Sequence, residues 1–121
     1  MEMVAFITTE LGDDLIVSFA IVDPADPTEI ESLTLLRATK YESFLPPEER
    51  GVSVSFERYP DDDRDLLEEV RFSDSEKTVR LGTQLRSYDL DVRKVDAEEL
   101  AEMRKVVHRM HRDGHFRWVE L

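Results

Sequence analysis

Apolar side chains recur at helical spacing in one stretch of this chain, residues 96–110, and this feature restricts its fold more than any other. Leu100, Met103 and Val107 lie three or four residues apart, so they line one face of a helix. The Asp-Ala-Glu-Glu sequence that begins at Asp96 is typical of a capped helix start. We therefore expect a single amphipathic helix near the C-terminus.

The chain ahead of this helix alternates apolar and polar side chains, which is typical of β-strands. In residues 52–59, Val52, Val54 and Phe56 alternate with polar residues. Similar patterns predict strands at residues 3–8, 15–22, 30–37, 67–72, 78–82 and 88–92, and the tail 115–121 can add a short one. We expect an α+β fold, an antiparallel β-meander of about six to seven strands followed by one C-terminal amphipathic helix.

The length and the cysteine count restrict the class of protein further. A chain of 121 residues fits one domain, so residues 1–121 are expected to form a single α+β domain. No cysteine is present, which excludes disulfides and thiol nucleophiles. The N-terminus lacks the basic segment of a signal peptide, and the apolar run 15–22 is too short to span a bilayer. These features favour a cytoplasmic protein that does not bind membranes.

Charge is the strongest compositional signal. The chain has a formal net charge of −12, of which −11 falls on residues 1–95. This excess disfavours binding to nucleic acid, because the phosphate backbone is also negative. It favours encounter with a basic protein surface. An alternative is that the charge only maintains solubility or reflects a salt-adapted host.

The densest acidic run is a candidate surface for such a partner. The candidate carboxylates are Asp61, Asp62, Asp63, Asp65, Glu68 and Glu69. Phe116 and Trp118 in the tail are candidate aromatic contacts, because aromatic residues are enriched at protein interfaces. Packing over a sheet edge is the alternative for both. The same two alternatives apply to the loop aromatics Tyr41 and Phe44 and to Leu45 beside them.

The three histidines are the candidate metal ligands of this chain. His108, His111 and His115 are the only three in the chain, and the first two share a helix face. Gly114 is expected beyond the helix end, which separates His115 from the others. We therefore predict no metal site, and these three residues remain the weak candidates for one.

Catalytic motifs are missing from the sequence. There is no G-x-S-x-G nucleophile elbow, and the four glycines are too far apart for a phosphate-binding loop. We expect no enzymatic activity, no catalytic residue and no cofactor. A small metal-binding hydrolase that uses the histidines is a less favoured alternative.

The order of several segments resembles a family of bacterial polymorphic-toxin immunity proteins. The similar pieces are DDLIVSFAIVD, GVSVSF, LLEEVRFS, TVRLG and YDLDV, followed by the acid-rich amphipathic helix. The resemblance implies a cytoplasmic protein that binds and blocks a cognate, basic toxin domain. We thus expect a non-catalytic, acidic protein-interaction domain, and a self-associating homodimer is the main alternative.

Overall fold

The computed structural model describes residues 1–62 and 64–121, in which eight β-strands and one α-helix are present. The strands are β1 (Glu2–Leu11), β2 (Asp14–Asp23), β3 (Asp26–Ala38), β4 (Ser53–Phe56), β5 (Leu67–Ser73), β6 (Thr78–Thr83), β7 (Ser87–Asp91) and β8 (Arg117–Glu120). The helix is α1 (Ala97–Met110), and two short 3₁₀ turns, Glu42–Phe44 and Pro47–Glu49, lie between β3 and β4. The predicted α+β class with one C-terminal helix is confirmed, with one strand more than predicted.

All eight strands belong to one sheet, in the order β4-β3-β2-β1-β7-β6-β5-β8. Two antiparallel meanders, β1–β4 and β5–β7, meet where β1 runs parallel to the end of β7. The tail strand β8 also pairs in parallel, with β5. Parallel neighbours need a long connection, and the one from β5 to β8 runs through β6, β7 and the helix α1.

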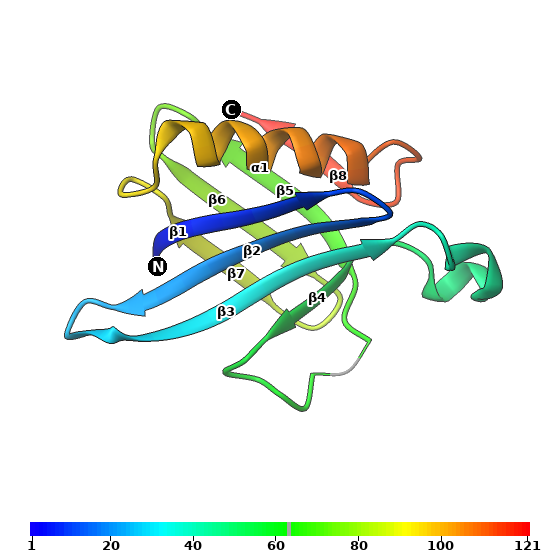
Figure 1. The fold of residues 1–121 in the computed structure, drawn as a ribbon, viewed down its shortest axis with the longest axis horizontal. Coiled ribbons are helices and arrows are strands. Elements are labelled where there is room, and N and C mark those ends of the chain that lie inside the picture. The colour runs from blue at the N-terminus through cyan, green and yellow to red at the C-terminus, as the bar shows by residue number, and fades with distance from the viewer. Residues whose placement is uncertain (63) are drawn as a thin grey trace.

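The sheet curls so that the first meander crosses in front of the second (Figure 1). At one corner the curl closes, because Ser53 forms an antiparallel bridge with Leu66 and the amide of Val54 donates to the carbonyl of Asp65 at 2.9 Å. The inward side chains of both meanders share one core; for example, the rings of Phe56 and Tyr88 lie 5.7 Å apart. The fold therefore has one enclosed interior and two outward sheet faces.

The helix α1 covers the opening between the two meanders at the top of Figure 1. Its buried side chains are Leu100, Met103, Val106, Val107 and Met110, which confirms the predicted apolar face. Asp96 caps the first turn by accepting from the amide of Glu98 at 2.8 Å. The carboxylate of Glu99 accepts from the amide of Ile7 in β1 at 2.8 Å, so it joins the helix to the sheet. No helix in the described residues is long and apolar enough to cross a membrane.

Candidate functional site

The acidic run that was predicted to face a partner does not form one free surface. Asp65 is only 1% exposed, and its carboxylate accepts from the hydroxyl of Thr83 at 2.6 Å and the amide of Leu85 at 3.1 Å. The prediction for Asp65 is therefore wrong, because this side chain holds the turn between β6 and β7 from inside. Asp63 lies outside the described residues.

The other acids of the run divide between ion pairs and solvent. Asp62 pairs with Arg86, which lowers the pKa of its carboxyl. Glu69 is 18% exposed and lies 3.0 Å from Arg71 and 3.2 Å from Arg117. Asp61 and Glu68 are the two acids of the described run that are exposed to solvent.

The aromatic residues of the tail pack inward. Phe116 is 4% exposed and its ring lies 4.9 Å from that of His111, so the prediction of Phe116 as an exposed contact is wrong. Trp118 is half-buried, with its ring 4.8 Å from that of His108. These contacts also separate the histidines, because His108 and His111 pack on two different aromatic rings. His115 instead joins a polar cluster at the end of β3.

Arg37 is the centre of that polar cluster. Its side chain is 2% exposed, although it continues the inward series of Leu33 and Leu35 on β3. Its guanidinium donates to Glu42 through Nε at 2.9 Å and Nη2 at 2.7 Å. It also donates through Nη1 to Asp113 Oδ1 at 2.8 Å and to the carbonyl oxygen of Met110 at 2.5 Å. A buried cation is thus fully paired with two carboxylates and a helix end.

Asp113 also links this cluster to His115. Nδ1 of His115 lies 2.8 Å from Oδ2 of Asp113, the oxygen that also accepts from Nη2 of Arg37. The guanidinium holds the pKa of Asp113 and that of Glu42 below their usual values. The two carboxylates in turn raise the pKa of Arg37. Arg37, Glu42 and Asp113 therefore hold one another in their charged forms.

Glu42, Asp113 and His115 bring their ligand atoms within 4.8 Å of one another, a spacing at which a metal ion could be held. The guanidinium of Arg37 already contacts both carboxylates with four nitrogen–oxygen pairs. A metal cation would have to displace this permanent positive charge, so the residues do not fit a metal site. The arrangement is that of a structural ion cluster.

The cluster holds one end of the loop 41–51, which joins β3 to β4. Glu42, the first residue of the 3₁₀ turn, is fixed by Arg37. At the other end, Gly51 has φ +129° and lies under the ring of His115, whose Cδ2 would be 3.5 Å from an added Cβ. Within the loop, Arg50 donates to the carbonyls of Leu45 at 2.9 Å and Ser43 at 3.3 Å. The loop is therefore fixed at both ends and braced inside.

This fixed loop carries the most exposed aromatic side chain of the described residues. Phe44 is 82% exposed, and its neighbours Tyr41 and Leu45 are 59% and 42% exposed. In Figure 1 the loop projects from the end of β3, away from the helix. Holding an aromatic ring in water is unfavourable by itself, so the exposure of Phe44 is the feature most suggestive of a contact site.

A hollow of about 520 Å³ lies beside the loop. It is lined by Leu45, Glu48, Glu49, Ser53, Arg64, Leu66 and Gln84. Leu45 and Leu66 line it with apolar side chains, and Glu48 and Glu49 line it with carboxylates, which we call its acidic rim; Glu49 is 3.3 Å from Arg64, which also lines the hollow. Phe44, the hollow and its acidic rim form the candidate site, which we call the loop site.

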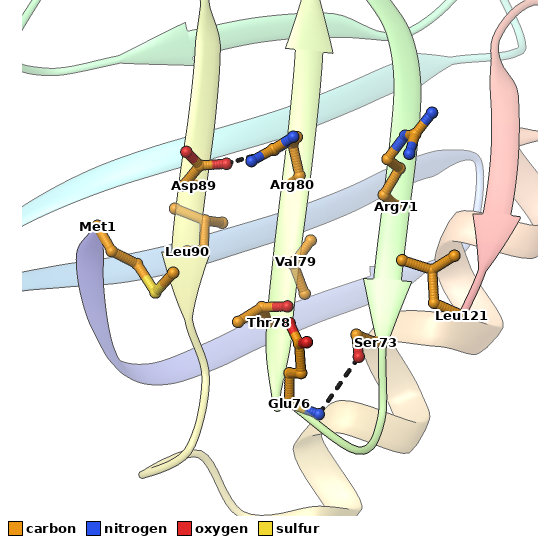
Figure 2. Close-up of a pocket in the computed structure, with 10 residues that line it drawn as sticks. All are labelled: Met1, Arg71, Ser73, Glu76, Thr78, Val79, Arg80, Asp89, Leu90 and Leu121. Atoms are coloured by element: carbon orange, nitrogen blue, oxygen red, sulfur yellow. Dashed lines mark hydrogen bonds and ion pairs between the residues drawn. The ribbon is translucent and has the colours of Figure 1, made fainter.

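A second hollow, of about 240 Å³, lies on the outward face of β5–β7 (Figure 2). Its side chains include Arg71, Arg80 and Asp89, and Arg80 donates to Asp89 at 2.6 Å. Arg80 and Asp89 are thus paired with each other, and Arg71 is paired with Glu69. We regard this hollow as part of an ordinary solvated sheet face.

For Tyr41, Phe44 and Leu45, the sequence left open whether the side chains pack over a sheet edge or contact a partner. It gave no prediction for Arg37. A signal for Arg37 was available, because a charged residue at an inward strand position demands buried partners.

Comparison with protein-family models, with curated proteins and with solved structures found no match to this chain.

Proposed function

We propose that this protein is a non-catalytic binding domain that captures an apolar segment with basic flanks from a protein partner at the loop site. The observation that carries the proposal is the 82% exposure of Phe44 on a loop that is fixed at both ends. A preorganised loop loses little conformational entropy on binding, so an aromatic residue on it contributes more to affinity. The immunity-type or inhibitor role of blocking a basic toxin domain is the form of this function that we favour.

Charge at the loop site supports a basic partner. The hollow is lined by Glu48, Glu49 and Arg64, and Arg64 pairs with Glu49. The exposed Glu48 is therefore the carboxylate that a Lys or Arg beside a bound apolar side chain would meet. The net charge of −12 adds long-range attraction that speeds the encounter and weakens with salt. We favour this surface over the acidic run at residues 61–69 because Asp65 is buried and Asp62 is paired there, whereas Glu48 at the loop site is exposed.

The histidine–carboxylate pair supports binding over catalysis. Asp113 and His115 resemble an acid–base pair, yet Asp113 also accepts from Arg37. Neither residue lines the hollow at the loop site or the one in Figure 2. A general base must reach the proton of a bound substrate, and these two residues instead hold the loop.

The test uses short labelled peptides of two kinds, a central Leu or Phe flanked by Lys and the same peptide flanked by Glu. Binding is followed by NMR through the backbone amides of Leu45, Ser53 and Leu66. We expect the Lys-flanked peptide to shift these signals and the Glu-flanked one to bind at least about tenfold more weakly, a difference of roughly 1.4 kcal/mol.

Two variants complete the design. Phe44→Ser should weaken binding of the Lys-flanked peptide, whereas the matched control Leu121→Ser removes an apolar side chain that is 72% exposed far from the loop and should not. Reversing both rim charges, with Glu48→Lys and Glu49→Lys, should exchange the preference between the two peptides. Equal binding of both peptides, or no shift at the hollow with either, would overturn the proposal.

A further inference from the structure

A third hollow, of about 270 Å³, lies between the C-terminal end of α1 and the turn that joins β1 to β2. In Figure 1 these two segments and the end of β3 lie at the same end of the molecule. The residues that line the hollow are Leu11, Gly12, Leu15, Thr39, Arg109 and Arg112. Because its charged lining residues are two arginines, we call it the arginine hollow.

The two arginines lack the carboxylate partner that most bases of this chain have. Arg109 and Arg112 are exposed, and no carboxylate in residues 1–62 and 64–121 forms an ion pair with either of them. Other exposed arginines, such as Arg80 and Arg93, pair with an aspartate on the surface. In a chain with 28 acids and 16 bases, two adjacent guanidiniums without a carboxylate are unexpected, and their charge is available to a ligand.

Strand register keeps two nearby carboxylates away from the arginine hollow. Leu11 is paired with Leu15, and Leu15 is paired with the buried Arg37, so both leucines lie on the inward face of the sheet. Side chains alternate between the two faces of a strand. The side chains of Glu10 and Asp14 therefore lie on the opposite face from α1.

Two other carboxylates are near the hollow in the chain. Asp113 follows Arg112 directly, but it is already paired with Arg37 and His115. Asp13 is exposed in the turn, and its backbone carbonyl accepts from the hydroxyl of Thr39 at 3.0 Å. The lining of the hollow therefore keeps a local positive charge within a strongly acidic chain.

The helix dipole explains one part of this arrangement, because bases in the last turn of a helix are stabilised by it. It does not explain the apolar side chains beside the two bases. Leu11 is 41% exposed, and Leu15 below it belongs to the core. The hollow thus combines two free cations with an apolar surface.

We propose that the arginine hollow binds the C-terminal carboxylate of a protein chain whose last residue is apolar. Guanidinium groups bind carboxylates through two parallel, charge-assisted hydrogen bonds, which Arg109 or Arg112 can supply. Leu11 would contact the apolar side chain of the same residue. The volume of about 270 Å³ is below the range of roughly 300–1,000 Å³ that drug-sized ligands occupy, so it suits a group of the size of one residue.

Charge favours a single carboxylate over a polyanion as the occupant. The chain has a net charge of −12, which repels every further negative charge that a ligand carries. A nucleic acid would add a charge with each phosphate, whereas a chain terminus brings one. The arginine hollow and the loop site share no lining residue, so this inference does not depend on the proposed function.

Titration of the full chain with small probes tests the inference, followed by NMR through the backbone amides of Leu11, Gly12 and Thr39. N-acetyl-leucine represents the end of a chain, and its uncharged matched control is N-acetyl-leucinamide. For a probe of this size we expect a dissociation constant on the order of 1–10 mM. The amide should bind at least about fivefold more weakly, because it cannot form the charge-assisted hydrogen bonds. N-acetylglycine keeps the carboxylate without the apolar side chain, and we expect it to bind at least about threefold more weakly.

Two pairs of variants locate the binding. Arg109→Gln and Arg112→Gln should each raise the dissociation constant of N-acetyl-leucine at least about threefold, whereas Lys94→Gln removes an exposed base ahead of α1 and should leave it unchanged. Leu11→Ser should weaken the same probe, and its control Leu85→Ser removes a leucine that is 56% exposed elsewhere and should not. The exposed arginines form no ion pair among the described residues, so their variants should remain folded by circular dichroism.

Three results would overturn the inference. The first is equal binding of N-acetyl-leucine and its amide, or no shift with either at about ten times the expected dissociation constant. The second is a folded Arg109→Gln, Arg112→Gln double variant that keeps full affinity. The third is inorganic phosphate that shifts the same amides at lower concentration than N-acetyl-leucine, because the hollow would then bind anions without using its apolar surface.

The loop site is tested separately in the same samples. Phe44→Ser should leave binding of N-acetyl-leucine unchanged, and Arg112→Gln should leave binding of the Lys-flanked peptide unchanged. A loss of one kind of binding with the other intact therefore shows which of the two sites is wrong.

Discussion

Nη1 of Arg37 lies 2.8 Å from Oδ1 of Asp113, and this contact joins two residues that are 76 positions apart in the chain. Arg37 is the second-to-last residue of the long strand β3, and Asp113 follows the helix α1. The pair therefore fixes the C-terminal tail and, through Glu42, the loop that carries Phe44. The position of Phe44 at the loop site therefore depends on the buried guanidinium of Arg37.

Replacing Arg37 by Met should lower the free energy of unfolding by about 3 kcal/mol, because it leaves two carboxylates close together without their cation. The value lies at the low end for buried pairs, since Asp113 is 40% exposed and can regain water. Urea unfolding followed by the fluorescence of Trp118, the single tryptophan, measures it.

The matched control for this change is Arg58→Met. Arg58 also bridges two carboxylates, those of Glu2 and Glu31, but it is 38% exposed. Exposed pairs contribute little, so we expect a loss below about 1 kcal/mol. Equal losses for Arg37→Met and Arg58→Met would contradict the role given to the buried cluster.

Acid should destabilise the protein through the same cluster. Asp113 and Glu42 have folded pKa values below their ordinary 3.8 and 4.5. A carboxyl with a depressed folded pKa contributes stability above its unfolded pKa, and this contribution is lost as the pH falls toward the folded value. We therefore expect the free energy of unfolding to fall from about pH 5 downward. Arg37→Met should flatten this dependence, and an unchanged slope in that variant would assign the acid sensitivity to other carboxyls.

Asp65 and Asp61 should respond very differently to the same substitution. Asp65→Ala removes the acceptor for the Leu85 amide and for the Thr83 hydroxyl, which we expect to cost about 1–3 kcal/mol. Asp61 is exposed, so Asp61→Ala should change the free energy of unfolding by less than about 0.5 kcal/mol. Thermal unfolding of both variants side by side measures the difference. Similar melting temperatures would contradict the structural role of Asp65.

The features that could be predicted from the sequence are those set by near neighbours. The helix follows from the spacing of Leu100, Met103 and Val107, and each strand follows from alternation within a few residues. The tail strand β8 was an alternative only, since its pairing with β5 joins residues far apart in the chain. Its partner cannot be identified from the local pattern of residues 115–121.

The candidate site illustrates the same limit. The inward position of Arg37 could be predicted, whereas its partner Asp113 could not, because the fold alone brings the two together. Within the acidic run at residues 61–69, the prediction for Asp65 is wrong for a related reason. Composition predicts a charged surface there, but the amide of Leu85 and the hydroxyl of Thr83 make one of its carboxylates a core residue.

The conformation of Gly51 connects the stability of the loop to the exposed site. Its φ of +129° is one that side chains with a Cβ rarely adopt, so Gly51→Ala should cost about 1–3 kcal/mol in backbone strain. The added Cβ would make only ordinary contact with His115, at 3.5 Å, so steric clash is not the cause. Gly12 has open space around it, and Gly12→Ala should be near neutral in urea unfolding.

The same variant should also affect binding without touching a contact residue. A strained Gly51 loosens the end of the loop that His115 covers, so Phe44 is held less firmly before the partner arrives. We expect Gly51→Ala to weaken the Lys-flanked peptide severalfold at a temperature where the variant remains folded, because the loop must then be ordered on binding. Gly12→Ala should bind like the unmodified chain. If Gly51→Ala loses stability and keeps full affinity, the rigidity of the loop is unrelated to its function.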